Sequence, residues 1–100
     1  MSDRERIGAA EALRRLHGWT AVEGREAIFK AYRFEDFSAA FGFMARVALA
    51  AEAMDHHPEW TNMYNRVEVT LATHSAKGVT ELDVVLAQTA DRIAGDLGAG

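Results

Sequence analysis

The sequence predicts an α+β domain in which a four-stranded antiparallel sheet carries three helices packed on one face. Segments whose apolar residues recur at helical spacing are separated by pairs of short segments in which apolar and polar residues alternate, in the order α-β-β-α-β-β-α. Two hairpins separated by helices build an antiparallel sheet, and helices with one apolar stripe pack on it from one side. The chain has 100 residues, too few for a second core, so residues 1–100 are expected to form a single domain.

Composition argues against several classes of protein. The formal net charge of −4 and the absence of a Lys/Arg cluster argue against nucleic acid as a partner. The chain has no cysteine, which excludes disulfides, thiolate zinc sites and a cysteine nucleophile. No apolar run resembles a signal peptide or a membrane span, so we expect a cytoplasmic protein with no membrane partner.

The first third of the chain predicts a helix and a hairpin. Ser2 suits the N-cap of the helix, and Glu5 can reach back to it as in a capping box. Before Gly18 ends this segment, apolar residues recur at near-helical spacing at Ile7, Ala10, Leu13 and Leu16. Residues 19–23 and 27–34 follow as two strands. Aromatic residues occur at both parities of the second strand, so its buried face stays open.

A long helix is predicted over residues 36–54, with Asp36 or Ser38 as its cap. Its apolar residues form two stripes, Phe37, Phe41, Met44, Ala48 and Ala51 in one and Phe43, Val47, Ala50 and Met54 in the other. One stripe is enough to pack on a sheet, so the second implies either a broad core or a surface for self-association. The size of Phe43 and Val47 in so small a domain favours self-association.

The second hairpin follows Pro58, which the long helix cannot pass. Residues 60–64 form a third strand, and Asn65-Arg66 suits a tight turn. The clearest strand pattern follows, with a buried face that carries Val67, Val69 and Leu71. His74 ends this strand on the opposite parity.

The last helix is predicted to begin at Thr80, a good N-cap, with Glu81 and Asp83 in its first turn. Its apolar stripe consists of Leu82, Val85, Leu86, Thr89 and Ile93.

Three of the four histidines, His56, His57 and His74, lie at the predicted ends of helices and strands, where distant segments can converge. Imidazole can both donate and accept a proton near neutral pH. Pro58 fixes the loop, and Trp60 offers a flat apolar wall for a planar ligand. Acidic neighbours that can orient an imidazole are Glu52, Asp55 and Asp83.

Three interpretations of this cluster remain. The histidines can occupy a surface turn and a strand end without further role. They can bind zinc together with an aspartate, although adjacent histidines lack the i, i+4 spacing that puts two ligands on one helix face. They can also act as metal-free acid–base catalysts on a planar substrate, which the spacing favours.

The same residues resemble a known family. The run Asp55-His56-His57-Pro58-Glu59-Trp60, followed by Thr73-His74 and by Gly78, Leu82 and Asp83, is similar to pterin-4a-carbinolamine dehydratase. Upstream, Glu23-Gly24-Arg25, Ala27-Ile28-Phe29-Lys30 and Phe41-Gly42-Phe43-Met44 also match, so the resemblance covers roughly residues 19–93. Ala76 stands where some family members carry a cysteine.

The resemblance implies a hydro-lyase that removes water from a 4a-hydroxytetrahydropterin to give the quinonoid dihydropterin. This reaction belongs to tetrahydrobiopterin recycling, with a functional link to phenylalanine hydroxylase. The pterin is the substrate, and no cofactor or metal is implied. The resemblance also implies a homodimer whose sheets join edge to edge, or a homotetramer formed through the long middle helices.

The resemblance also suggests residue roles. His56 and His74 would transfer protons, and His57 would hold the substrate. Asp83 would orient an imidazole, and Trp60 would pack on the ring or the loop. Asp55 and the backbone of Ala72, Thr73 and Ser75 would line the pterin pocket, with Pro58 and Glu52 beside them. The alternative is a protein-binding module, a dimerisation cofactor of a transcription factor, that acts through the middle-helix surface.

Overall fold

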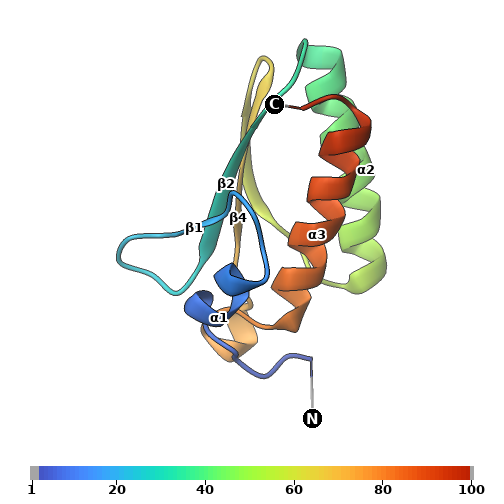
Figure 1. The fold of residues 1–100 in the computed structure, drawn as a ribbon. Helices are drawn as coiled ribbons and strands as arrows, with labels where there is room; N and C mark the ends of the chain where they lie inside the picture. Colours follow the sequence, from blue (N-terminus) through green and yellow to red (C-terminus); the bar gives the residue numbers. More distant parts are fainter. Residues whose placement is uncertain (1–2, 100) are drawn as a thin grey trace.

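The computed structural model describes residues 3–99 and confirms the predicted order of helices and strands (Figure 1). A short 3-10 helix, η1, lies between the last strand and the last helix. The elements are α1 (Ala9–Arg14), β1 (Thr20–Ala21), β2 (Ile28–Arg33), α2 (Phe37–Met54), β3 (Glu59–Met63), β4 (Arg66–Leu71), η1 (His74–Ala76) and α3 (Glu81–Asp96).

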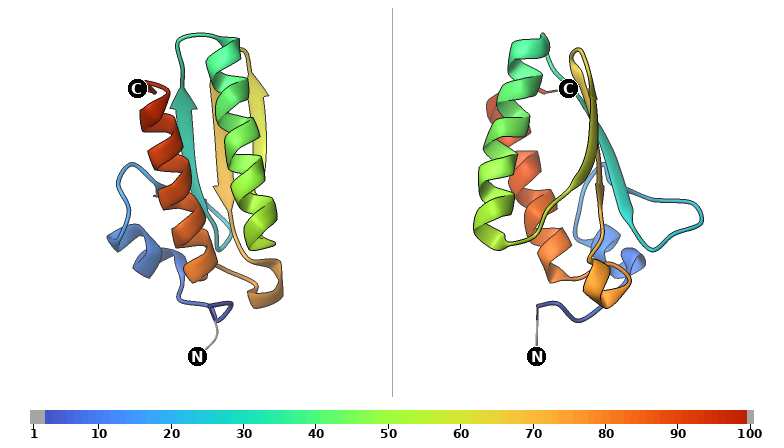
Figure 2. Two further views of the ribbon diagram at one scale, coloured as in Figure 1. Left: turned by 90° about the vertical axis from the view of Figure 1, so that its right-hand side faces the viewer. Right: turned by 180° about the vertical axis from the view of Figure 1, so that it is seen from behind.

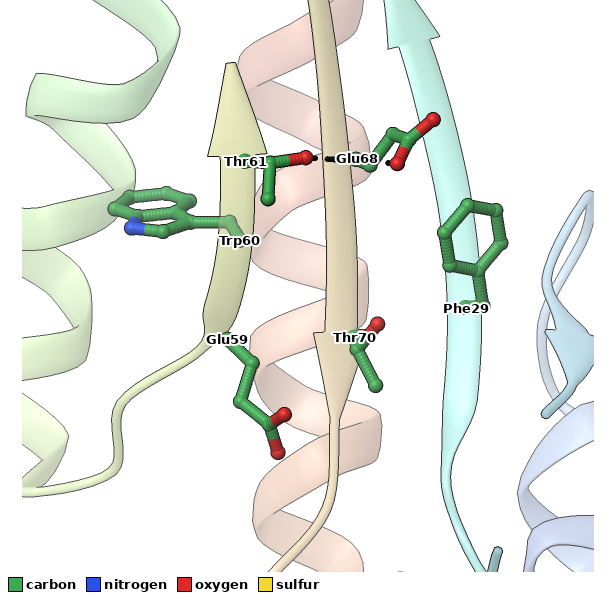
Figure 3. Close-up of a pocket in the computed structure, with 6 residues that line it drawn as sticks. All are labelled: Phe29, Glu59, Trp60, Thr61, Glu68 and Thr70. Carbon is green, nitrogen blue, oxygen red and sulfur yellow. Dashed lines mark hydrogen bonds between the residues drawn. The ribbon is translucent and has the colours of Figure 1, made fainter. Parts of the chain in front are cut away.

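The four strands form one antiparallel sheet in the order β1-β2-β4-β3. Ile28 of β2 and Trp60 of β3 lie opposite Leu71 and Val69 of β4. The helices α2 and α3 lie side by side over one face, and α1 lies beside the N-terminal half of α3 (Figure 2). No helix of the described part of the chain covers the other face, which carries Phe29, Thr61, Glu68 and Thr70 (Figure 3).

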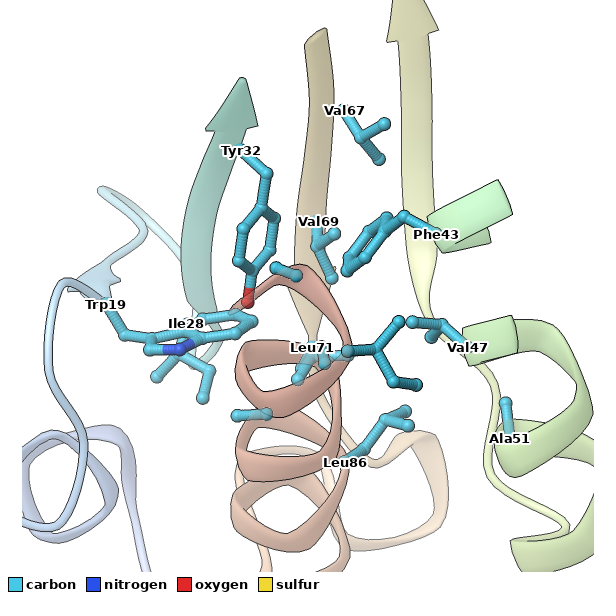
Figure 4. Packing of buried hydrophobic residues seen from close by; sticks show 14 of the residues in the cluster. Trp19, Ile28, Tyr32, Phe43, Val47, Ala51, Val67, Val69, Leu71 and Leu86 are labelled. Atoms are coloured by element: carbon cyan, nitrogen blue, oxygen red, sulfur yellow. The ribbon is translucent and has the colours of Figure 1, made fainter. Parts of the chain in front are cut away.

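The core lies between the sheet and the two long helices (Figure 4). Strand β4 supplies three buried residues, as its alternation predicts, namely Val67, Val69 and Leu71. The open question about β2 is resolved, because Ile28 and Tyr32 are the buried residues of that strand. The ring of Phe43 from α2 lies 4.8 Å from the Tyr32 ring and 5.0 Å from the Phe34 ring, centroid to centroid. Burial of each such side chain contributes about 1.5–3 kcal/mol to stability.

Helix α1 begins later than predicted, at Ala9, and the expected cap Ser2 lies outside the described residues. Arg6 forms an isolated antiparallel bridge with Thr80, so the chain is extended where a helix was predicted. The start of α1 is instead capped from a distance, because the backbone N–H of Ala9 donates to Glu26 Oε1 at 2.7 Å. The start of α1 therefore depends on residues distant in the sequence, which a local capping pattern does not reveal.

Helix α2 begins as predicted, with Asp36 as its N-cap. The carboxylate of Asp36 accepts a hydrogen bond from the backbone N–H of Ala39 at 2.8 Å. The helix ends at Asp55, whose left-handed backbone (φ 52°, ψ 44°) turns the chain toward the next strand.

One side of α2 remains uncovered. Its buried residues are Ala40, Phe43, Val47 and Ala51. Phe37, Phe41 and Leu49 on other sides are 49%, 57% and 75% exposed, so the helix has more apolar surface than this domain covers.

Contrary to expectation, α2 is also long and apolar enough to cross a membrane, with a mean hydropathy of 1.3. Core helices pass the same test, and α2 packs one side on the sheet.

Helix α3 begins at its predicted cap. Thr80 and Asp83 form a reciprocal capping box, in which the Thr80 hydroxyl accepts from the backbone and Asp83 accepts from the Thr80 N–H. The predicted apolar stripe is partly wrong, because Val85 is 45% exposed. Leu82, Leu86 and Ile93 of the stripe are buried as predicted, and Val84 and Ala87 are buried as well. The buried face is wider than predicted because the helix packs against α2 and α1 as well as the sheet.

Candidate active site

One cavity, of about 280 Å³, opens where α2 ends and where β4 gives way to η1. Its lining residues come from three separate parts of the chain and are Arg4, Asp55, His56, His57, Ala72, Thr73, His74 and Ser75. All of these except Arg4 belong to the predicted site. The structure therefore brings the three histidines of the sequence pattern to one cavity.

The end of α2 places the first two histidines. Asp55 has a left-handed backbone, a conformation that costs a non-glycine residue about 1–2 kcal/mol and that is found preferentially at functional sites. After this turn the backbone N–H of His56 donates to Ala51 O at 3.0 Å, which holds His56 against the helix end. His57 follows at the surface, and Pro58 leads into β3.

The end of β4 places the third histidine. Thr73 N donates to Gly78 O at 2.7 Å and Gly78 N donates to Thr73 O at 3.3 Å, so these two residues close a short loop. His74 and Ser75 begin η1 inside this loop, at the edge of the cavity. His74 is exposed to solvent.

A buried network of hydrogen bonds fixes His56. Its Nε2 lies 2.6 Å from Oδ1 of Asp83, and the two side chains are 6% and 0% exposed. The other carboxylate oxygen of Asp83 accepts from Thr73 Oγ1 and from the backbone N–H of Thr80, both at 2.9 Å. A carboxylate can only accept hydrogen bonds, so Nε2 of His56 carries the proton and Nδ1 is the nitrogen for a ligand in the cavity.

The other two histidines have different surroundings. His57 Nε2 lies 2.8 Å from Glu52 Oε1 in a pair whose side chains are 56% and 81% exposed. His74 lies near Glu59, a residue of the motif that was not among the predicted site residues. The pKa of Glu59 is held below its ordinary value mainly by hydrogen bonds from Arg25, at 2.9 and 2.7 Å, with a smaller contribution from the nearby His74.

The remaining predicted residues do not line the cavity. Asp83 lies behind His56, and Glu52 reaches the rim through His57. Pro58 is half-buried and connects His57 to β3. Trp60 lies opposite Val69 and points toward α2 (Figure 3), and it is not among the residues that line the cavity. Trp60 packs against the hydrophobic core and also lines a separate shallow pocket on the sheet. This position does not fit the expectation that Trp60 forms a flat wall for a ligand in the histidine cavity.

The sequence pattern gave no indication of Arg4. Its guanidinium Nη2 donates to the backbone oxygen of Asp55 at 3.3 Å, across 51 residues of sequence. Only the docking of the segment before α1 brings it to the cavity. Among the described residues, no three His, Asp or Glu side chains come together as ligands for one metal ion.

Comparison with known proteins decides the family. Residues 3–93 match the family model for pterin 4 alpha carbinolamine dehydratase. The chain belongs to this family. The pterin-4-alpha-carbinolamine dehydratases are hydro-lyases, and the family was the one predicted from the residues around His56 and His74.

Several relatives are close in sequence. Proteins of Brucella ovis and Brucella canis, provisionally named pterin-4-alpha-carbinolamine dehydratases, are each 65% identical over 85 residues, which is 85% of this chain and 88% of theirs. A crystal structure from Brucella melitensis, described as a transcriptional coactivator/pterin dehydratase, is 60% identical with a TM-score of 0.87. It covers 91% of this chain and 100% of that one.

A more distant structure shares the fold. It is described as a pterin dehydratase-like protein that is a RuBisCO assembly factor in the alpha-carboxysome. It is 22% identical to this chain with a TM-score of 0.69, and the match covers 81% of this chain and 94% of that one. The sheet with two long helices on one face is therefore shared by proteins with different roles.

Proposed function

We propose that this protein removes water from 4a-hydroxytetrahydropterins by histidine acid–base catalysis, giving the quinonoid dihydropterin. The observation that carries the proposal is the convergence of His56, His57 and His74 on one cavity, in a chain of the pterin-4-alpha-carbinolamine dehydratase family. Expulsion of hydroxide from C4a needs a proton on the leaving oxygen, and the quinonoid ring forms only when a ring nitrogen loses a proton. One acid and one base therefore suffice, with no net change in protons.

His56 and His74 supply these two groups in our proposal. They come from different elements, the end of α2 and the start of η1, so a flat ring can lie between them. Buried Asp83 fixes the tautomer and orientation of His56, while His74 stays in contact with solvent and can exchange its proton. His57 holds the substrate at the rim, and Asp55 with the backbone of residues 72–75 lines its binding site.

The test is the rate of dehydration of a freshly generated 4a-hydroxytetrahydropterin, followed by ultraviolet absorbance. The reaction also proceeds without catalyst, so a sample without protein is the blank. We expect the protein to exceed the blank by about 10²-fold or more, the range for positioned acid–base groups. A rate equal to the blank would refute the proposed activity.

We also propose that the protein acts in the cytoplasm together with phenylalanine hydroxylase. If so, adding this protein should speed the recycling of the tetrahydropterin that the hydroxylase consumes.

The exposed side of α2 favours a second role, in assembly. Phe37, Phe41 and Leu49 are large, exposed and on one helix, and one related structure is described as a transcriptional coactivator as well as a pterin dehydratase. We propose that this surface joins copies of the chain, as in the homotetramer expected through the middle helices, or binds a helical partner. Phe41→Glu should lower the mass measured by light scattering, whereas Arg14→Glu on α1 should not. An unchanged mass for Phe41→Glu would contradict assembly through α2.

A further inference from the structure

The cavity has one wall that the acid–base chemistry does not use. Arg4 lines it together with the histidines and Asp55, and it comes from the segment before α1. Of the described residues that line the cavity, Arg4 alone carries a permanent positive charge, because a guanidinium stays protonated at all ordinary pH values.

The segment that carries Arg4 is attached firmly to the rest of the site. The backbone N–H groups of Ile7 and Gly8 both donate to Val79 O, at 2.8 and 3.2 Å. Arg6 pairs with Thr80 and its Nη1 donates to Lys77 O at 3.2 Å. These contacts fix the segment on the loop between η1 and α3, next to His74.

Gly78 makes this attachment possible. A Cβ atom at position 78 would lie 2.5 Å from Cδ of Arg6 and 3.1 Å from Cγ of Glu26. A side chain at position 78 would therefore have to displace the side chains of Arg6 and Glu26, which make contacts that attach this segment. The hydrogen bond from Arg4 Nη2 to Asp55 O joins the guanidinium to the left-handed end of α2, beside the cavity that both residues line.

The position of Arg4 points to one part of a pterin. The reacting carbon, C4a, has to lie between His56 and His74, whereas the substituent at C6 takes no part in the reaction. Arg4 is exposed at the rim, so it meets the part of the ligand that reaches toward solvent. A guanidinium presents five N–H donors in a planar fork and binds oxygen atoms in preference to hydrocarbon.

We propose that Arg4 is a specificity-determining residue that hydrogen-bonds the C6 substituent of the pterin and selects substituents that carry hydroxyl oxygens. This inference rests on the proposed pterin dehydratase function of the same cavity. It assigns to the segment before α1 a role in substrate choice, separate from the proton transfers of the histidines.

The test measures binding, so that its result does not depend on turnover. The probes are two stable dihydropterins, one with a dihydroxypropyl group at C6 and one with a methyl group, titrated calorimetrically into the full-length protein. A hydrogen bond to a charged group contributes about 1.5–3 kcal/mol, so Arg4→Ala should weaken the dihydroxypropyl ligand about tenfold or more. The methyl ligand should change by less than about twofold. Arg4→Lys should recover part of the loss, because it keeps the charge without the planar fork.

The matched control is Arg14→Ala, an exposed arginine on α1 that pairs with Glu11 and lies outside the cavity. It should leave both affinities unchanged. Equal weakening of both ligands by Arg4→Ala, no weakening of either, or failure of the wild-type protein to bind either ligand would overturn the inference. Selective weakening in a protein that does not accelerate dehydration would leave the Arg4 assignment standing and refute the proposed function instead.

Discussion

His56 and Asp83, which are 27 residues apart in the sequence, meet in the interior with 2.6 Å between Nε2 and Oδ1. The same carboxylate caps the start of α3 by accepting from the backbone N–H of Thr80. One buried side chain therefore sets both the beginning of a helix and the orientation of an imidazole. Stability of α3 and geometry of the cavity are coupled through Asp83.

This coupling predicts that Asp83→Asn damages both activity and stability. The amide of asparagine keeps one oxygen acceptor and replaces the other with an NH₂ donor. In either orientation this NH₂ would face another donor, on His56 in one case and on Thr73 and Thr80 in the other. We expect dehydration to slow by about 10–100-fold or more, as for other groups that orient a catalytic or metal-bound imidazole. Urea denaturation should show a loss of about 1–3 kcal/mol. Asp96→Asn, on the surface of the same helix, should change stability by less than about 0.5 kcal/mol. Full activity in Asp83→Asn would contradict the orienting role.

The aromatic cluster under α2 predicts a large effect of Phe43→Ala. The Phe43 side chain is fully buried against the rings of Tyr32 and Phe34. The cavity left behind should cost about 3–5 kcal/mol, a large share of the stability of a domain of this size. Chemical denaturation measures this directly. Val85→Ala, at the exposed position of α3, is the control and should stay within about 0.5 kcal/mol of wild type. A similar loss in both variants would contradict the described core.

Alkaline pH should destabilise the protein through Tyr32. Burial raises the pKa of the Tyr32 phenol, and its hydrogen bond to Asp91 at 2.6 Å adds to the shift. The fold therefore favours the neutral phenol. This contribution is fully present below the pKa of a tyrosine in the unfolded chain, about 10, and is lost as the pH rises above it.

The measurement is the free energy of unfolding between about pH 8 and about pH 11. Wild type should lose stability over the upper part of this range. Tyr32→Phe, which has no phenol to ionise, should show a shallower decline. Parallel curves for the two proteins would show that Tyr32 is not the cause.

The cap on α1 can be tested by Glu26→Ala. The side chain of Glu26 accepts from the first backbone N–H of α1, and loss of such a cap costs about 1 kcal/mol. The exposed Glu23, in the same loop, is the matched control and should be nearly neutral when replaced by alanine. If both variants lose the same amount, the cap contributes nothing specific.

Local patterns in the sequence predicted most of the fold. The alternation of Val67, Val69 and Leu71 identified the buried face of β4, and the pattern at Thr80 and Asp83 identified the start of α3. These features depend on neighbours within a few residues, which a sequence displays directly. The start of α1 depends instead on Glu26 and on pairing with Thr80, and neither contact has a local signal.

The candidate site was predictable to a similar degree. The histidine positions at the ends of elements were enough to place them together, because element ends converge in a small sheet domain. Arg4 was missed because its contact with Asp55 spans 51 residues. The direction of Trp60 was predictable from the strand pairing. Trp60 lies directly opposite Val69, so a register that buries Val69 also turns Trp60 toward the helices.

The most direct measurement compares dehydration by wild type with dehydration by three single-histidine variants. His56→Ala and His74→Ala should each lose most of the acceleration over the blank while keeping the circular dichroism spectrum of a folded protein. His17→Ala removes the fourth histidine, which lies at the surface outside the cavity, and should keep full activity. Undiminished activity in both His56→Ala and His74→Ala would contradict histidine acid–base catalysis in this cavity.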